Sequence, residues 1–509
     1  MKLERTKNTG RNIVYGTTLK LYQIVVPFLI RTAMIYCLGI QYVGISSLFV
    51  SILQVLNLME LGVGSAMVFS MYKPIAQDDT ETICALMRLY RLYYRVIGLA
   101  ILVIGVILVP FLPHLIKDDL PSDVNLYVLY LLNLAATVAS YWLFAYKNCL
   151  LAAYQRNDIT SKIGMAISTI EYGLELLVIV FFKNYYLYLL VKILTQILSN
   201  IVTAKKVDRI FPDYTPRGNM DKEIVSDINR KVRDLFTAKV GGVIVNSADN
   251  IVISSFLGLT VLAIYNNYYY ILTSVIGFVT IIFNACIAGI GNSLVTETEE
   301  KNYNDFKLFT FIIVWISGFC SCCFLCLFQP FMKLWLKDSS SMLGMLEVLC
   351  LCIYFFVYEM AAMMIQYKDA AGIWHEDRFR PLITALFNLM LNLILVQSIG
   401  LLGVILSTVI SFILIGIPWL VKNLFSILFH TSPVSYIKTM VYYILITIMA
   451  GGTSYSICTL IPGDGILSFI LKGVTCCIIP NIIFTVGYYR LKEFDQAFQL
   501  VKRMFGIKN

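Results

Sequence analysis

Long apolar runs follow one another along almost the whole chain, and they constrain its fold more than any other feature. Each run has about 20 residues or more, the length that an α-helix needs to cross a hydrocarbon layer about 30 Å thick. With 59% hydrophobic and 14% charged residues, the chain lacks the polar side chains that would cover a water-facing surface. We therefore predict an all-α polytopic membrane protein.

The apolar runs are bounded by charged residues or by Pro and Gly, and they predict about fourteen transmembrane helices. These lie near residues 12–37, 42–72, 83–112, 124–146, 163–182, 185–203, 234–257, 262–291, 308–331, 342–367, 381–397, 403–421, 439–460 and 466–489. The first span contains Pro27 and Arg31 and has no A-x-A cleavage site after it, so we interpret it as a retained helix and not as a signal peptide.

Lys and Arg are distributed unevenly among the segments that join the spans. The termini and alternate loops on one side contain 28 of the 40 basic residues, whereas the other side contains only Lys117, Lys183, Lys333 and Lys337. Cytoplasmic loops retain basic residues, so both termini are predicted to be cytoplasmic. The same distribution accounts for the net charge of +9 without nucleic acid as a partner.

A short internal repeat predicts two similar halves. LGIQYVGI at 38–45 matches LGLTVLAI at 257–264, and at the same offset Lys20 aligns with Lys239. Six helices per repeat give two six-helix bundles that run in the same direction, related by a pseudo-two-fold axis along the membrane normal. The predicted parts are an N-terminal bundle (1–203), a cytoplasmic amphipathic linker (204–233), a C-terminal bundle (234–421), and helices 13 and 14 with a cytoplasmic tail (422–509).

Eight of the 40 basic residues lie within predicted spans, where an uncompensated charge costs about 2.5 to 3.5 kcal/mol. Lys20 and Arg31 are three helical turns apart, so they share one face of the first helix. With Lys239 they predict a cationic, substrate-binding cavity between the halves. Lys20 and Lys239 are also placed where they could extend to the inner headgroups. Arg31 lies too deep for the inner interface, which leaves the outer interface or the cavity.

Further charged residues within the spans are candidates for binding or coupling. Arg88, Arg91 and Arg95 form a stripe that could capture substrate or anchor the helix at the inner interface. Glu60 and Asp249 are our candidates for coupling transport to H⁺ or Na⁺. Glu171 and Glu175 share one helical face, and Lys147 or Lys192 could compensate their charges.

No cofactor, catalytic group or metal site is predicted. The 13 cysteines lie mostly in apolar runs, where thiols pack as small hydrophobic groups. Cys323-x-x-Cys326 has a redox or zinc spacing, but its location in a span favours packing.

Four blocks of the sequence resemble bacterial polysaccharide (O-antigen, Wzx-type) flippases of the multidrug/oligosaccharidyl-lipid/polysaccharide exporter superfamily. They are YCLGIQYVGISSLFVSILQVLNLMELGVGSAMVFSMYKP (36–74), VGGVIVNSADNIVISSFLGL (240–259), IYNNYYYI (264–271) and YKDAAGIWHEDRFRP (367–381). The resemblance implies a multi-pass protein of the bacterial cell (inner) membrane with a V-shaped fold of two six-helix bundles and two extra helices. It also implies a lipid-linked anionic oligosaccharide as substrate, and alternating access of its head group to a cationic cavity. A polysaccharide polymerase is an expected partner.

Two other functions are alternatives to a flippase. A cation-coupled multidrug exporter of the same superfamily would have an acidic, aromatic cavity, whereas Lys20, Arg31 and Lys239 favour an anionic cargo. A membrane-embedded glycosyltransferase or polymerase would need an aqueous catalytic loop, and the predicted external loops are short. We therefore expect a transporter and not an enzyme.

Overall fold

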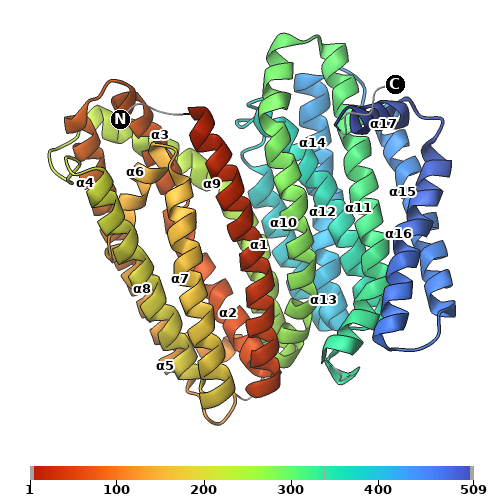
Figure 1. Ribbon diagram of the computed structural model, residues 1–509, viewed down its shortest axis with the longest axis horizontal. Coiled ribbons are helices and arrows are strands. Elements are labelled where there is room, and N and C mark those ends of the chain that lie inside the picture. Colours follow the sequence, from red (N-terminus) through yellow and green to blue (C-terminus); the bar gives the residue numbers. More distant parts are fainter. Residues whose placement is uncertain (1–4, 119, 337–338, 505–509) are drawn as a thin grey trace. The chain divides into compact units, whose positions relative to one another are not determined.

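The computed structural model describes residues 5–118, 120–336 and 339–504. Over these residues the chain is helical and contains no β-strand. Eleven of the described helices are long and apolar enough to cross a membrane, or twelve if the bent pair Leu126–Trp142 and Ala145–Ala153 counts as one span. The chain is therefore a polytopic α-helical membrane protein, as predicted (Figure 1). The two chain ends, for which a cytoplasmic location was predicted, lie outside the described residues.

The predicted count of about fourteen spans is not confirmed. The predicted spans 381–397 and 403–421 fall in one apolar stretch, Arg380–Leu428. Its helix α13 has non-helical backbone angles at Ile399 and Gly400, so a two-residue break separates the runs that the sequence pattern counts as two helices. The eleven spans also leave out α10, several of whose side chains lie outside the described part.

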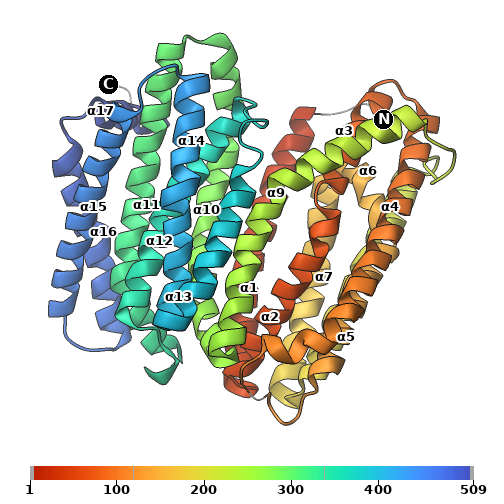
Figure 2. The same cartoon turned by 180° about the vertical axis from the view of Figure 1, so that it is seen from behind.

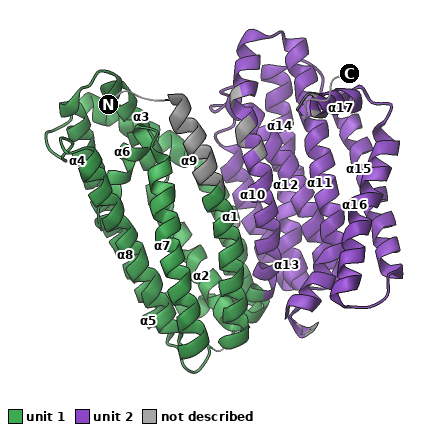
Figure 3. Ribbon diagram, in the orientation of Figure 1, with its two compact units in different colours: residues 1–263 green, residues 264–509 purple. Residues whose placement is uncertain are grey.

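The chain forms two compact units, residues 1–263 and 264–509 (Figure 3). The helices of the first unit are α1 (Arg5–Cys37), α2 (Ile40–Leu56), α3 (Val63–Ala76), α4 (Thr80–Leu108), α5 (Leu126–Trp142), α6 (Asn148–Ala153), α7 (Asn157–Leu177), α8 (Tyr185–Ile210) and α9 (Lys222–Leu257). Within this unit α1 packs along α7, and α2 packs along α9.

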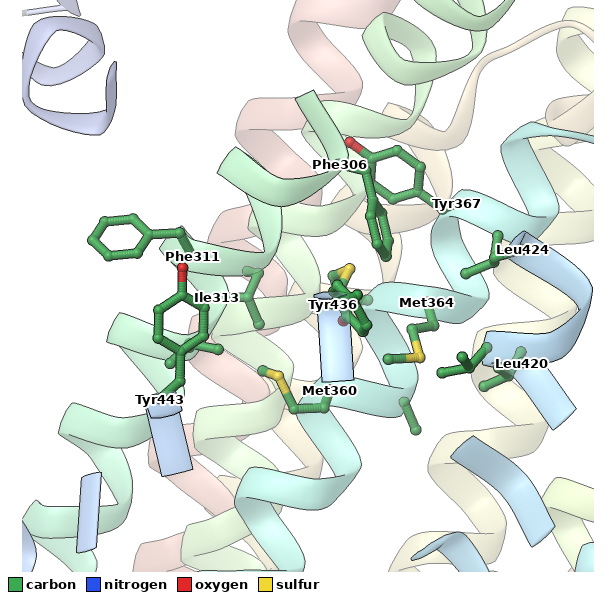
Figure 4. Packing of buried hydrophobic residues seen from close by; sticks show 14 of the residues in the cluster. Phe306, Phe311, Ile313, Met360, Met364, Tyr367, Leu420, Leu424, Tyr436 and Tyr443 are labelled. Carbon is green, nitrogen blue, oxygen red and sulfur yellow. The ribbon is translucent and has the colours of Figure 1, made fainter. Parts of the chain in front are cut away.

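The second unit is built around α11, which contacts α12, α15, α16 and α17. Its helices are α10 (Leu259–Thr296, whose first residues belong to the first unit), α11 (Glu299–Leu336), α12 (Met345–Ala370), α13 (Arg380–Ser411), α14 (Ile417–Asn423), α15 (Val434–Leu460), α16 (Ile466–Tyr488) and α17 (Lys492–Met504). Aromatic rings fill its core, in which Phe306 packs against Tyr367 and Tyr436 at ring-centroid distances of 4.9 and 5.3 Å (Figure 4).

The predicted linker 204–233 is not a separate helix in the structure. It comprises the end of α8, a non-helical segment at 211–221 and the first turns of α9, which continues unbroken to Leu257. Figure 2 shows the first part of α9 running obliquely to the other helices of its unit before it turns to run beside α2. The predicted part boundaries at 203, 233 and 421 remain predictions, because the chain divides by compactness after Ala263.

The loops of the first unit gather at two ends. At one end the hydroxyls of Tyr154 and Tyr214 lie 2.6 Å apart and join two segments that were predicted to be cytoplasmic. At the other end the backbone N–H of Asn125 donates to the Tyr186 hydroxyl at 2.7 Å and joins the first turns of two spans that were predicted to begin on the external side. This arrangement agrees with the predicted alternation of loops within the unit.

The sequence repeat is also a repeat of backbone geometry. Gly39, before α2, and Gly258, after α9, have φ angles of +124° and +98°, which favour glycine. Each donates its N–H to the carbonyl five residues earlier at 3.0 Å, Gly39 to Met34 and Gly258 to Ile253. The matching Leu-Gly pairs therefore make the same turn between consecutive helices.

Gly44 on α2 lets the backbone of α2 come close to the backbone at the start of α10. A Cβ atom at Gly44 would lie 2.2 Å from the backbone oxygen of Leu259. We expect Gly44→Ala to lower the stability of the folded protein by about 1 to 3 kcal/mol, because the backbone must move to admit the methyl group. Thermal unfolding in detergent measures the effect.

Gly173→Ala on α7 is the matched control, because a Cβ atom there would meet nothing within 4 Å. Its melting temperature should stay the same or rise, since Ala favours a helix more than Gly does. Equal melting temperatures for the two variants would contradict the close approach at Gly44.

Candidate functional site

The predicted span 42–72 is interrupted in the structure, and the interruption carries Glu60. Helix α2 ends at Leu56, a 3-10 turn (η1) occupies Asn57–Glu60, and α3 begins at Val63. Gly62 between them has a φ of +91°. A break at membrane depth frees backbone polar groups, so it is tolerated only where protein or a wet cavity covers it. Broken helices are also where transporters commonly bind ions and substrates.

Tyrosine hydroxyls surround the Glu60 carboxylate. Tyr94 donates to its Oε1 at 2.7 Å and itself accepts a hydrogen bond from Tyr90 at 2.6 Å. The Tyr141 hydroxyl lies 3.4 Å from Oε2 and 3.2 Å from the amide oxygen of Asn57. Among the described residues no Lys or Arg forms an ion pair with Glu60. The carboxylate is therefore held by neutral donors, an arrangement that can accept a proton or a cation.

Arg31 lies half-buried on α1. It is within electrostatic reach of Tyr188 on α8, as are Glu171 and Glu175 of α7. Glu175 is only 2% exposed, and Lys192 of α8 acts on both carboxylates. Arg31, Glu171 and Glu175 therefore act on the same tyrosine, whereas the sequence predicted a cationic cavity around Arg31. Helix α1 packs on α7, a relationship that the sequence pattern does not reveal.

Of the two lysines suggested as partners for Glu171 and Glu175, only Lys192 takes that role. The Lys147 Nζ atom instead lies 2.6 Å from an oxygen of Asp208 on α8. This ion pair connects the turn after α5 to the last turns of α8.

Lys20 on α1 and Lys239 on α9 are both exposed. Within the described part of the chain, neither forms an ion pair. Their exposure is compatible with contact to an anionic substrate and with contact to lipid headgroups.

Asp249 lies in a polar seam between α9 and α2 and is 8% exposed. Next to it, the Asn250 amide donates to the Ser51 hydroxyl at 2.8 Å. One turn away, the Ser247 hydroxyl donates to the Gln54 side-chain oxygen at 3.3 Å. Buried polar groups that satisfy one another in this way hold two spans in register.

The arginine stripe of α4 is largely occupied by contacts within its own unit. Arg88 donates to the backbone oxygen of Gly218 at 2.8 Å and so fastens the 211–221 segment to α4. The Arg91 guanidinium lies 5.8 Å from the centre of the Tyr146 ring. Arg95 is exposed. These contacts favour an anchoring role for the first two arginines, and Arg95 is the member of the stripe that is best placed to meet a ligand.

The 367–381 block, to which the sequence assigned no role, forms a buried ion-pair network between α12 and α13. Asp377 is 2% exposed and accepts from Arg380 Nε at 2.7 Å and from Arg380 Nη2 at 2.9 Å. Lys368 Nζ lies 3.3 Å from the second Asp377 oxygen and 2.6 Å from Asp369. Gly372 makes the turn with a φ of +72°. The network fixes the connection between the two helices.

Three cysteines from different helices form the only group of this kind that the described residues offer to a metal ion. The sulfurs of Cys326, Cys458 and Cys476 all lie within 4.8 Å of one another and are buried, and Cys323 packs against them. Thiolates favour soft ions such as Cu(I) and Zn²⁺. Sequence spacing identified only the Cys323–Cys326 pair, because the other two residues join the cluster through tertiary packing.

Solved structures with the same fold are multidrug transporters and a lipid flippase. The inward-facing conformation of a multidrug resistance MATE family transporter of the MOP superfamily is 16% identical, with a TM-score of 0.62; the match covers 82% of this chain and 99% of that one. The lipid II flippase MurJ, in an inward closed conformation, is 15% identical, with a TM-score of 0.65; the match covers 94% of this chain and 99% of that one.

A MOP superfamily transporter from Pyrococcus furiosus, whose binding pocket is described as having reverse polarity, is 14% identical, with a TM-score of 0.53; the match covers 81% of this chain and 94% of that one. The sequence matches no protein-family model and no curated protein. At these identities the similarity establishes the fold.

The buried network at Asp377 yields a prediction about stability. Asp377→Ala should lower the free energy of unfolding by about 3 to 5 kcal/mol, because it leaves Arg380 and Lys368 buried without their shared acid. Thermal or denaturant unfolding in detergent measures the loss.

The control for this variant is Glu297→Ala, which breaks the exposed pair between Lys301 and Glu297. It should leave unfolding almost unchanged, because exposed ion pairs contribute little. If both variants unfold like the unsubstituted protein, the 367–381 network does not stabilise the connection.

Proposed function

We propose that this protein is a flippase that moves an undecaprenyl-diphosphate-linked oligosaccharide from the cytoplasmic to the outer leaflet for cell-surface polysaccharide biosynthesis. It would act by alternating access in the bacterial inner membrane, with both termini in the cytoplasm. A polysaccharide polymerase would then use the transported oligosaccharide.

The extent of the fold carries this proposal. The lipid II flippase matches 94% of the chain, whereas the multidrug transporters with the same fold match 80% to 84%. Much of α11 packs against α15, α16 and α17, so these C-terminal helices are part of the second unit and not an appended tail. A chain with this larger helix set is more similar in architecture to the flippase.

The chemistry of the substrate explains why a protein is required. A diphosphate with several sugars has many polar groups, and each one left unpaired in hydrocarbon costs several kcal/mol. A path lined with hydrogen-bonding groups and cations removes most of that cost, while the polyprenyl tail can stay among the acyl chains.

Arg31 is the residue that we propose to contact the diphosphate. A guanidinium binds phosphate oxygens through two parallel hydrogen bonds, and this one lies half-buried on a spanning helix. Lys20, Lys239 and Arg95, which are exposed, would add positive charge along the path, with Arg88 and Arg91 supporting the entrance.

Glu60 and Asp249 are the proposed coupling residues. Glu60 lies at a helix break and accepts hydrogen bonds from Tyr94 and Tyr141, so protonation or cation binding there would change how α2 and α3 are joined. Asp249 lies in the seam between α9 and α2, where a change of charge would affect the packing of two spans. The counter-ion would be H⁺ or Na⁺.

A cation-coupled multidrug exporter is the second candidate. The acidic pair Glu171 and Glu175 beside Tyr172 and Tyr188 favours it, because acids and aromatic rings suit an organic cation. The two candidate functions differ in the charge of the transported molecule, which is negative for the flippase and positive for the multidrug exporter. Transport assays in one set of vesicles can therefore distinguish them.

The direct experiment uses purified protein in proteoliposomes. We expect translocation of a fluorescent undecaprenyl-diphosphate-linked sugar and no transport of ethidium. Arg31→Ala should lower the rate about 30-fold or more, the effect of losing a charged hydrogen-bond partner worth about 2 kcal/mol. Arg31→Lys should keep part of the activity, because it keeps the charge but not the paired hydrogen bonds.

Lys301→Ala is the control, since it removes a cation from an exposed helix start. Ethidium transport without lipid translocation would identify a multidrug exporter. Full lipid translocation by correctly inserted Arg31→Ala protein would exclude Arg31 from the path.

A second experiment tests coupling. Transport driven by a pH or Na⁺ gradient should fall in Glu60→Gln to the rate measured without a gradient, because the amide cannot take up the ion. Glu81→Gln, an exposed acid near the start of α4, should keep the full gradient response. A full gradient response in Glu60→Gln would assign coupling to another residue.

A further inference from the structure

A groove of about 730 Å³ lies on the first unit between α7 and α8, two helices that run side by side (Figure 1). One wall is apolar, with Ile159, Ile163 and Ile167 repeating every four residues along α7. The opposite wall comes from the last turns of α8. The groove is separate from Glu60, Arg31 and the other residues of the proposed transport path.

The rim of this groove is strongly basic. Five cations line it, against the single acid Asp158: they are Arg156, Lys162, Lys205, Lys206 and Arg209. Asp158 is already engaged, because its oxygens lie 3.0 Å from Arg156 Nε and 3.9 Å from Lys162 Nζ. The other three cations, Lys205, Lys206 and Arg209, are exposed. They form no ion pair with any described residue. The groove therefore has an excess of positive charge that an anionic ligand would neutralise.

The apolar surface continues from the groove along both helices. On α7, Ile170, Leu174 and Leu177 are 50%, 42% and 50% exposed. On α8, Leu194 and Leu198 are 64% and 41% exposed. A basic rim followed by a strip of exposed aliphatic side chains matches a ligand with an anionic head and long apolar chains. A free anion would use only the rim.

The basic end also lies where a headgroup would be found. Tyr154 and Tyr214 join the segments that flank the groove, and both segments were predicted to be cytoplasmic from their Lys and Arg content. Basic pockets between spanning helices on the cytoplasmic side attract the headgroups of anionic lipids.

We propose that the groove between α7 and α8 binds an anionic phospholipid of the inner leaflet. Its phosphate contacts Lys205, Lys206 and Arg209, and its acyl chains lie along the exposed aliphatic residues of the two helices. The bound lipid clamps the ends of α7 and α8 together. This site takes a membrane component and not the transported substrate, so it goes beyond the proposed function.

The test measures lipid binding, which does not depend on transport. Purified protein in a neutral detergent is titrated with phosphatidylglycerol, with phosphatidylcholine of the same acyl chains, and with inorganic phosphate, and bound lipid is counted by native mass spectrometry. We expect saturable binding of phosphatidylglycerol, weaker binding of phosphatidylcholine and no comparable binding of phosphate. Salt should weaken the binding, since exposed charges are screened.

The variant Lys205→Gln/Lys206→Gln/Arg209→Gln should lose affinity for phosphatidylglycerol by about 100-fold, given the usual contribution of each basic residue near an anionic surface. Lys301→Gln/Lys307→Gln/Arg490→Gln removes the same charges from the second unit and should bind like the unsubstituted protein. If the triple variant does not fold, the single variants Lys206→Gln and Arg209→Gln should each show a partial loss. Unchanged binding in the groove variants, equal loss in the control, or equal binding of inorganic phosphate would overturn the proposal.

Discussion

The cost of leaving polar groups unpaired in hydrocarbon governs this structure. Along its regular helices the backbone satisfies its own N–H and C=O groups, which is why a chain so rich in apolar residues folds without strands among its described residues. Charged and polar side chains must then find partners inside the units. Three groups meet that requirement in different ways. Lys192 acts on Glu171 and Glu175, and tyrosine hydroxyls surround Glu60. Ser51, Asn250 and Asp249 form a polar seam between two spans.

Where the chain departs from a regular helix, polar side chains hold it in place instead of helical backbone hydrogen bonds. At η1 the Asn57–Glu60 turn lies beside Tyr94 and Tyr141. Between α12 and α13, Asp377 holds Arg380 and Lys368 around a glycine turn. The first case lies at membrane depth and could change with protonation, which makes it a candidate for coupling. The second joins the end of one span to the start of the next and holds that connection in place.

The sequence predicted the helical class, most span positions and the Leu-Gly repeat, because each depends on local periodicity or on a single backbone conformation. It did not predict the break at Glu60, because NLMELGVG reads as part of one apolar run of sufficient length. It placed Arg31 in a span but did not show that Arg31, Glu171 and Glu175 act on the same Tyr188. It found Cys323 and Cys326 but not Cys458 and Cys476. These relationships arise when helices distant in the sequence pack together, and no residue spacing within one helix records them.

The proposed transport path depends most on which group Arg31 contacts when substrate is bound. The most direct measurement is a cryo-electron microscopy structure of the protein in a nanodisc with an undecaprenyl-diphosphate-linked sugar. We expect phosphate density within hydrogen-bonding distance of the Arg31 guanidinium. Substrate density elsewhere, with none against Arg31, would contradict the proposed path.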